Sequence, residues 1–315
     1  MLYRAKASGS LILLGEYAVL HGKTALVAAI NKSIFVALKP RNDDRIFIDS
    51  DLGTLHISRH QIFAQAPFEF ILEALNFVKP LSGCNIEVTS DLPSSFGLGS
   101  SAAITVALLI VLNRWHKKSL TKIDLWKAAL QVIHRVQGVG SGADCAASIF
   151  GGVIAFNNSP FSVISLKEKP PLVAIYSGNK LSTARAINII NKKRQQCLID
   201  YKKIEEKMHA LSIKAINIIN TRNWIALGNL FNSGQELMTA MGVSNIFLEN
   251  LIYALRKQPN ILGAKISGSG FGDCIIGVGK FLPTYFPRNK EERKLGVKQI
   301  PLSIISKGAE FDEIQ

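Results

Sequence analysis

Apolar residues follow two different spacings along the chain, and together these spacings predict a mixture of strands and helices. Alternation of apolar and polar residues over 83–89 indicates a strand with one buried face. Short apolar runs at 152–156 and 172–176 predict further strands. A three- to four-residue spacing over 68–78 and 126–136 indicates amphipathic helices. The pattern is therefore typical of an α+β fold.

The same mixture extends to both ends of the chain. Over residues 4–38, apolar stretches are broken by glycines, which predicts a pair of strands joined by a turn at 15–22. Long helical patterns fill residues 200–258, and a last strand is predicted at 275–278. The polar stretch 157–171 separates the two halves, so we expect an N-terminal domain at 1–160 and a C-terminal domain at 161–315.

The longest apolar run, residues 104–112, follows a glycine- and serine-rich loop. Its length and composition predict a buried helix. Gly97 and Gly99 permit a tight turn whose backbone amides face outward, next to the positive end of the helix dipole. This combination is an anion site suited to phosphate. Ser100 and Ser101 add hydroxyl oxygens of the kind that a nucleotide-bound Mg²⁺ takes as ligands.

Asp144 follows a run of glycines, and two interpretations of it are open. An aspartate after glycines is typical of a helix N-cap. The same carboxylate can accept the proton of an attacking hydroxyl, because the glycines before it and the small alanines after it leave room for a substrate. A further glycine-rich stretch, 263–274, either brings the backbone close to a ligand or forms a turn between strands.

Four segments resemble parts of the GHMP kinase superfamily, which includes galactokinase, homoserine kinase, mevalonate kinase and phosphomevalonate kinase. Three of them follow the order of the family's motifs: the first motif at 15–22, the second at 93–102 and the third at 263–274. Residues 93–102 read Pro-x-x-x-Gly-Leu-Gly-Ser-Ser-Ala, the pattern of the phosphate-binding motif. Residues 15–22 resemble the N-terminal motif of mevalonate kinases, and Ser-Gly-x-Asp at 141–144 resembles the segment that carries their catalytic base. Residues 263–274 resemble the third family motif.

This resemblance implies a two-domain GHMP kinase fold with the active site in the cleft between the domains. The N-terminal domain is expected to resemble domain 2 of ribosomal protein S5, and the C-terminal domain a ferredoxin-like fold. ATP and Mg²⁺ are the implied cofactors, and a small molecule with a hydroxyl or phosphate group is the implied acceptor.

The resemblance also assigns roles to individual residues. Asp144 is expected to be the catalytic base, with Ser10 and Thr183 beside the reacting groups. Ser101 and His134 are the expected metal ligands. The expected acceptor-binding residues are Glu16, His21, Gly142 and Arg185, and the expected ATP-binding residues are Pro93, Gly97, Leu98, Gly99, Ser100, Ser101, Ala102, Gly268, Ser269 and Gly270.

Two positions depart from the family pattern. Ser10 stands where the family has a lysine that holds the catalytic aspartate ionised, so another cation is expected to replace it, or the chemistry is weakened; Lys6, Lys23 and Arg185 are the nearest candidates. His134 stands near the position where mevalonate kinases carry a metal-binding glutamate, which leaves the second metal ligand open.

The acceptor is the least defined part of this interpretation. The compact length and His21-Gly22-Lys23 favour mevalonate kinase, which we rank first. Tyr17, Gln137 and Asp273 favour phosphomevalonate kinase instead. A binding protein that keeps the fold and has lost catalysis is the alternative from another class.

Charge, cysteine content and the length of the apolar runs limit the other partners that we expect and the compartment. The net charge is +14, but the basic residues are spread out and their clusters lack interleaved aromatics, so the charge favours steering of anionic substrates over nucleic-acid binding. The four cysteines show no metal-type or Cys-x-x-Cys spacing, which is typical of reduced thiols and of a cytoplasmic protein. The longest apolar run is too short to span a bilayer, so no membrane partner is expected; a homodimer is left open.

Overall fold

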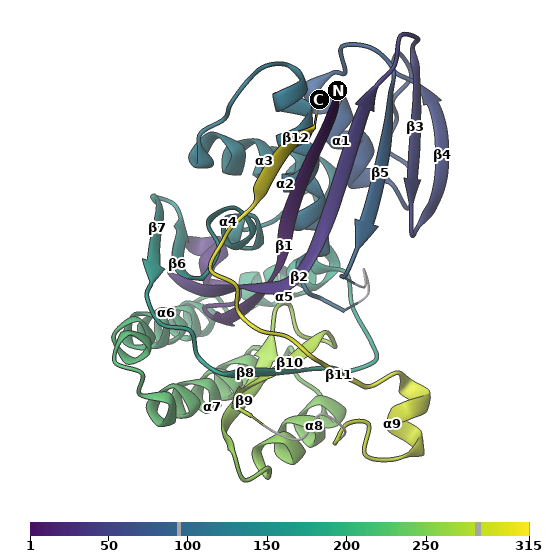
Figure 1. Cartoon of the computed structure of the whole chain (residues 1–315). Coiled ribbons are helices and arrows are strands. Elements are labelled where there is room, and N and C mark those ends of the chain that lie inside the picture. The colour runs from purple at the N-terminus through teal and green to yellow at the C-terminus, as the bar shows by residue number, and fades with distance from the viewer. Residues whose placement is uncertain (93–95, 281–284, 315) are drawn as a thin grey trace.

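Strands from the N-terminal half of the chain form one large sheet, to which the C-terminal end adds an edge strand (Figure 1). The computed structural model describes residues 1–92, 96–280 and 285–314. The strand order is β12-β1-β2-β5-β3-β4, and β6 pairs with both β2 and β7. Neighbouring strands are antiparallel except for β3 and β5. The strands are β1 (Leu2–Leu14), β2 (Ala25–Pro40), β3 (Arg45–Ser50), β4 (Gly53–Ser58), β5 (Cys84–Ser90), β6 (Val153–Asn158), β7 (Phe161–Leu166) and β12 (Glu310–Ile314).

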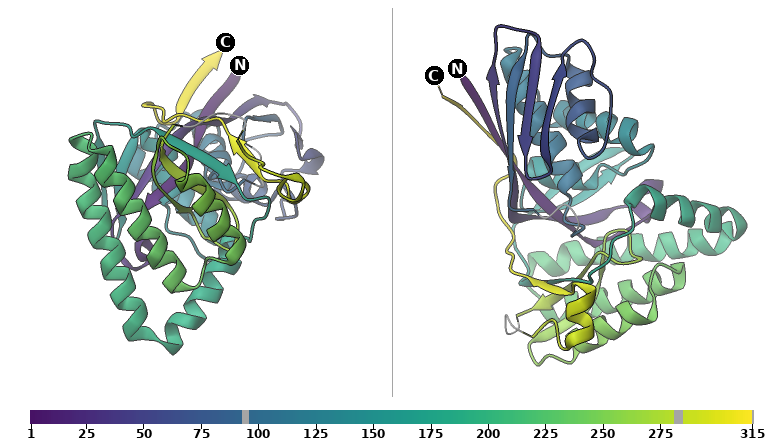
Figure 2. Two further views of the ribbon diagram at one scale, coloured as in Figure 1. Left: turned by 90° about the horizontal axis from the view of Figure 1, so that it is seen from below. Right: turned by 90° about the vertical axis from the view of Figure 1, so that its right-hand side faces the viewer.

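Helices cover one face of this sheet, as the right-hand view of Figure 2 shows. They are α1 (Glu69–Val78), α2 (Ser100–Trp115), α3 (Lys122–Gln137) and α4 (Ala143–Phe150). Helix α2 packs between β1 and β2 on one side and α1 and α3 on the other, which is why its apolar residues surround the whole helix. The buried helix predicted after Ser101 is therefore confirmed. A short 3₁₀ helix, η1 (Ala18–His21), follows β1.

The second sheet has four antiparallel strands in the order β11-β8-β10-β9. Helices α7 and α8 pack on β9 and β10, and α6 packs on α7. Figure 2 shows these long helices extending away from the first sheet. The elements of this half are β8 (Leu172–Tyr176), α5 (Thr183–Gln196), α6 (Leu198–Asn220), α7 (Trp224–Met241), α8 (Ile246–Arg256), β9 (Ile261–Ser267), β10 (Cys274–Gly279), α9 (Lys290–Leu295) and β11 (Lys298–Ile300).

The chain does not divide into the two sheets at a single point. The division predicted between residues 160 and 161 falls inside the β6–β7 hairpin, whose two strands belong to the same sheet. After β11 the chain returns to the first sheet, where Ile305 N–H donates to Ala29 O at 3.1 Å. Strand β12 then pairs with β1, so the two termini lie side by side (Figure 1). The α+β class predicted from the apolar pattern is confirmed.

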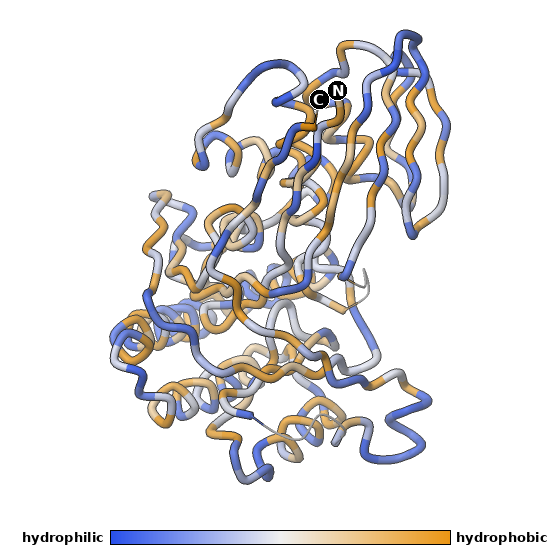
Figure 3. Tube along the Cα trace, viewed as in Figure 1, coloured by the Kyte–Doolittle hydropathy of each residue, from blue (hydrophilic) through white to orange (hydrophobic). Residues whose placement is uncertain are grey.

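Hydropathy follows this architecture. In Figure 3 apolar segments follow the strands and helices of both halves, whereas many of the outer turns are polar. Within the described ranges, we find no helix whose length and apolar character would let it cross a bilayer.

Candidate active site

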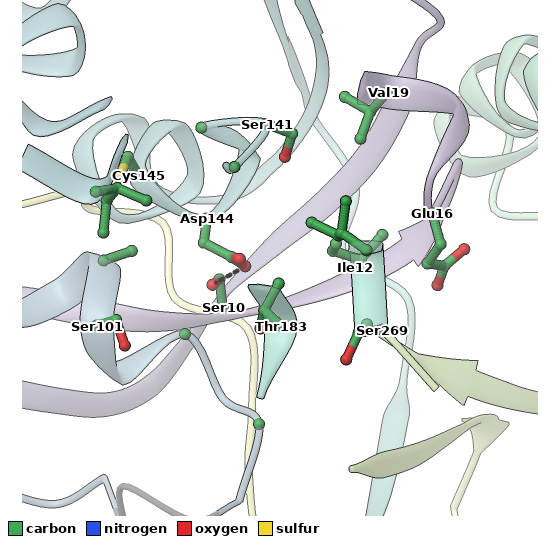
Figure 4. A pocket seen from close by; sticks show the side chains of 18 of the residues that line it. Ser10, Ile12, Glu16, Val19, Ser101, Ser141, Asp144, Cys145, Thr183 and Ser269 are labelled. Carbon is green, nitrogen blue, oxygen red and sulfur yellow. Dashed lines mark hydrogen bonds between the residues drawn. The ribbon is translucent and has the colours of Figure 1, made fainter. Parts of the chain in front are cut away.

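A cavity of about 130 Å³ lies where the two sheets approach each other, and segments from both halves line it (Figure 4). Many of the residues predicted for the site meet there, although their segments are far apart in the sequence. The lining includes Ser10, Glu16, Gly97, Gly99, Ser100, Ser101, Ala102, Gly142, Asp144, Thr183, Gly268 and Ser269.

Helix α2 begins at this cavity, and its glycine N-cap leaves the first turn open to a ligand. Gly99 has a φ of +71°, and a Cβ atom there would lie 2.2 Å from Ser10 Oγ. Ser10 N–H donates to Leu98 O at 3.0 Å, which fixes the loop against β1. Since glycine has no side-chain oxygen to cap the helix, the first-turn N–H groups of α2 are available to an anion.

Asp144 lies in the first turn of α4, and the N-cap is Gly142, with a φ of +77°. The interpretation of Asp144 as an N-cap is therefore wrong. Its Oδ1 instead accepts a hydrogen bond from Ser10 Oγ at 2.6 Å (Figure 4). Burial raises the pKa of Asp144, while the Ser10 hydrogen bond and the charge of Lys180 oppose this rise. Trp126 Nε1 donates to Gly142 O at 2.9 Å and so holds the turn before α4.

The third motif brings another carboxylate, the buried Asp273, to the same cavity. Its Oδ2 accepts from Ser269 Oγ at 2.9 Å, whereas its Oδ1 has no hydrogen-bond partner among the described residues. Burial raises the pKa of Asp273 to about 6, with the charge of Lys180 opposing the rise and that of Asp144 adding to it. A Cβ atom on Gly97 would lie 2.6 Å from Asp273 Oδ1, so the second and third motifs are in contact.

Asp273 and Lys180 were not among the predicted site residues. In the sequence, Asp273 stands at the end of a glycine-rich stretch. That position bore only on the choice between mevalonate and phosphomevalonate as the acceptor. Lys180 stands in the short loop between β8 and α5, and nothing in its local pattern separates it from other surface lysines. Only the tertiary structure brings it to the cavity.

Glu16 is held by the opposite half of the molecule. It forms a buried ion pair with Lys265 of β9, and burial raises the pKa of Glu16 while the lysine opposes the rise. The neighbouring Tyr17 hydroxyl donates to Ser269 O at 2.5 Å. The first and third motifs are therefore joined across the cavity, and the Glu16 charge is largely balanced by Lys265.

Other predicted residues lie outside the cavity lining. His21 Nε2 is 3.5 Å from Glu205 Oε1, and a ring nitrogen of the exposed His134 is 2.8 Å from Gly140 O. Arg185 is exposed on α5. Leu98 and Gly270 also do not line the cavity, and Pro93 falls outside the described residues.

None of the cations considered as a replacement for the family lysine reaches the cavity. Lys6 Nζ lies over the ring of Phe35, 5.6 Å from its centroid, and Lys23 pairs with Glu206. Arg185, the third candidate, is not in the cavity lining. Within the described ranges, the cavity lining contains a single lysine or arginine, Lys180.

The matches to known proteins agree with this arrangement of motifs. Residues 64–152 match the GHMP kinases N terminal domain, and residues 212–293 match the GHMP kinases C terminal domain. The chain is 34% identical to a mevalonate kinase of Archaeoglobus fulgidus, over 88% of this chain and 92% of the relative. It is 31% identical to a mevalonate kinase of Thermococcus sibiricus, over 87% of this chain and 88% of the relative. The chain belongs to the GHMP kinases.

The fold supports the same assignment. A crystal structure of mevalonate kinase superimposes with a TM-score of 0.77 at 22% identity, covering 96% of this chain and 99% of that one. The two-domain GHMP kinase fold implied by the motifs is thereby confirmed. As a GHMP kinase, the chain is an ATP-dependent phosphotransferase.

Proposed function

We propose that this GHMP kinase transfers the terminal phosphoryl group of ATP to the primary hydroxyl of mevalonate. The observation that carries the proposal is the half-buried Asp144 carboxylate, hydrogen-bonded to Ser10 in a cavity that also receives the N-terminus of α2. A general base next to a phosphate-binding helix is the pair of groups that phosphoryl transfer to a hydroxyl requires. The relatives named mevalonate kinase support mevalonate as the acceptor.

A second cavity supports a nucleotide site on the other side of the α2 N-terminus. It has a volume of about 530 Å³ and shares Ser100 and Ser101 with the first cavity. Apolar side chains, among them Phe68 and Leu92, contribute to its lining, as a site for a purine base requires. A nucleotide bound there would extend its phosphates along the start of α2 toward Asp144.

The residues present fit a nucleotide-bound Mg²⁺. Mg²⁺ commonly keeps several waters and takes its other ligands from substrate phosphates and one or two protein oxygens. Ser101 lines both cavities, and its hydroxyl would be such an oxygen. The described residues contain no group of three or more His, Cys, Asp or Glu side chains that could hold a metal ion. When bound, the ion would neutralise phosphate charge.

The protein's own groups would act on the acceptor as follows. Asp144 accepts the hydroxyl proton as the oxygen attacks, and Ser10 orients the carboxylate through its 2.6 Å hydrogen bond. The N–H groups at the start of α2 stabilise negative charge on the transferred phosphoryl group. Thr183 lines the cavity at the start of α5 and is proposed to position the acceptor.

The charge of the cavity favours mevalonate over phosphomevalonate. Glu16, Asp144 and Asp273 line it, and the Glu16 charge is balanced by Lys265. Two carboxylates then face one lysine, so an acceptor with a further phosphate would meet more repulsion than an acceptor with a single carboxylate. Tyr17 and Gln137, which favoured phosphomevalonate on sequence grounds, do line the cavity, so phosphomevalonate remains the second candidate.

An acceptor panel tests the proposal. ADP release is measured with MgATP and, in turn, mevalonate, phosphomevalonate, galactose and homoserine. We expect turnover with mevalonate. Turnover of phosphomevalonate alone would make phosphomevalonate, and not mevalonate, the acceptor. Turnover of galactose or homoserine alone would reject both candidates. Tight MgATP binding without turnover of any acceptor would instead support a binding protein.

A further inference from the structure

The loop that carries Lys180 is tied by its backbone to the third motif. Asp273 N–H donates to Asn179 O at 2.8 Å, and Ser177 N–H donates to Asp273 O at 3.0 Å. A Cβ atom on Gly272 would lie 2.5 Å from Asn179 O, so the two loops touch. Since Lys180 follows Asn179 directly, its main chain is fixed relative to Asp273, and its half-buried side chain lines the cavity.

The charges around Asp144 show what this lysine can do. Asp144 accepts a hydrogen bond from the neutral Ser10 of β1 and lines the cavity together with Asp273 of the β9–β10 loop and Lys180 of the β8–α5 loop. Cys145, the next residue of α4, is a buried thiol whose pKa is raised, so it stays neutral. The charge of Lys180 lowers the pKa of both Asp144 and Asp273, against the effect of burial.

We propose that Lys180 is the charge-balancing residue of this active site: its ammonium group offsets the Asp144 and Asp273 carboxylates together and keeps Asp144 in the form that accepts a proton. Lys180 acts through Asp144 and is therefore a positioning residue. The inference rests on the proposed function, because it assigns to Asp144 the role of base. It also explains how a cavity with Ser10 beside its base can keep that base ionised.

Kinetics of Lys180 variants test the proposal. In Lys180→Met and Lys180→Gln the pKa of Asp144 rises, so the acid limb of the kcat profile moves to higher pH by about one unit or more, as expected for a lost neighbouring charge. On the acid limb the loss in kcat is on the order of tenfold, and it narrows as the pH rises, while the affinity for MgATP stays nearly unchanged. Lys180→Arg keeps the charge and is expected to keep most of the activity.

Lys192→Met provides the matched control. Lys192 is exposed on α5, the helix that follows the Lys180 loop, and does not line the cavity. Its variant is expected to keep the wild-type kcat and pH profile. A loss of kcat in the Lys180 variants that is equal at all pH values, or no loss at all, would overturn the inference.

A measurement without any acceptor separates this inference from the proposed function. Carboxyl ¹³C resonances of the aspartates are followed against pH in the free protein, with Asp144→Asn and Asp273→Asn used for assignment. In Lys180→Met both carboxyl groups are expected to titrate at higher pH than in the wild type. Unchanged titration would reject the role of Lys180 even if the enzyme turns over mevalonate. An upward shift would support that role even if the acceptor panel rejects mevalonate.

Discussion

At the scale of single residues, Asp144 and Asp273 are two carboxyl groups in one cavity whose hydrogen-bond partners differ. Asp144 accepts from the Ser10 hydroxyl through Oδ1 and stands at the start of a helix. Asp273 binds its own loop through Ser269 and leaves Oδ1 without a partner among the described residues. Burial raises both pKa values. In the proposed mechanism the first group accepts the proton, whereas the second is bound within the third motif.

Asp144→Asn is expected to lower kcat by about 10²- to 10⁴-fold, the range for loss of a general base. Affinity for MgATP stays nearly unchanged, since Asn has the shape of Asp and the start of α2 is untouched. Steady-state kinetics with mevalonate and calorimetric titration of MgATP measure the two effects. With phosphomevalonate the loss is milder, because the acceptor phosphate can itself take the phosphoryl group. Near-normal turnover of mevalonate would contradict the role of Asp144 as the base.

Asp273→Asn is expected to change stability in a pH-dependent way. The folded-state pKa of Asp273 is raised from 3.8 to about 6, so its protonation favours the folded state; that contribution is full below about pH 4 and lost as the pH rises through 6. Asparagine does not titrate, so relative to the wild type the variant gains stability between pH 4 and pH 8, by about 3 kcal/mol at most, at roughly 1.4 kcal/mol per pKa unit.

Urea unfolding of the wild type and of Asp273→Asn at both pH values measures this gain. Asp200→Asn is the control, because the Asp200 side chain is 74% exposed. We expect it to show little pH-dependent difference. The same stability difference between Asp273→Asn and the wild type at pH 4 and pH 8 would contradict the raised pKa of Asp273.

At the scale of elements, α2 and α4 both begin at the cavity with a glycine N-cap in a left-handed conformation. The rest of α2 is buried between the first sheet and two helices, which fixes the direction of its axis. The position of its N-terminus is therefore set by the hydrophobic core, and the glycine loop lets β1 approach closely enough for Ser10 to reach Asp144.

Gly99→Ala is expected to destabilise the fold and to remove most of the affinity for MgATP. The left-handed backbone costs roughly 1–2 kcal/mol for a residue with a Cβ atom. That atom would also lie 2.2 Å from Ser10 Oγ, so the loop must shift. Gly138→Ala is the matched control: its φ is +74°, and nothing lies within 4 Å of its added Cβ atom. Unfolding should show a loss of stability in both variants, and MgATP titration a loss of affinity only in Gly99→Ala. Equal MgATP affinity in the two variants would contradict the prediction.

At the scale of the whole molecule, the two sheets are joined beside the cavity by polar contacts. Glu16 at the end of β1 pairs with Lys265 of β9, and Ser267 Oγ donates to Ile12 O at 2.8 Å. The C-terminal segment adds a second connection when it returns to pair with β1. Relative movement of the two halves therefore has to disturb contacts that also shape the cavity.

Lys265→Met is expected to lower the free energy of unfolding by about 3–5 kcal/mol, because it leaves the Glu16 carboxylate buried without its partner. The double variant Glu16→Gln with Lys265→Met should recover much of this loss, since no unpaired charge is left. Lys23→Met is the matched control: it breaks an exposed pair with Glu206 and should cost about 0–1 kcal/mol. Urea unfolding measures all three. Equal losses in Lys265→Met and Lys23→Met would show that the buried pair does not stabilise the fold.

The sequence alone predicted those features that depend on residues close together in the chain. The helix after Ser101 was predicted because its apolar residues are consecutive, and the phosphate site because glycines and a helix start are adjacent in the chain. For Asp144 the local pattern left two interpretations open, an N-cap and a base, and the motif resemblance favoured the base. The motif resemblance then supplied the fold, which periodicity alone does not specify.

The tertiary structure decided which charges meet. Glu16 and Lys265 are 249 positions apart, and Ser10 and Asp144 are 134 apart, so no local spacing relates them. The same holds for Lys180, which reaches the cavity because its loop is bonded to the third motif, and for His21, which lies near Glu205 instead. Burial and neighbouring charge set the state of a carboxylate, and both depend on the packing of segments that are distant in the chain.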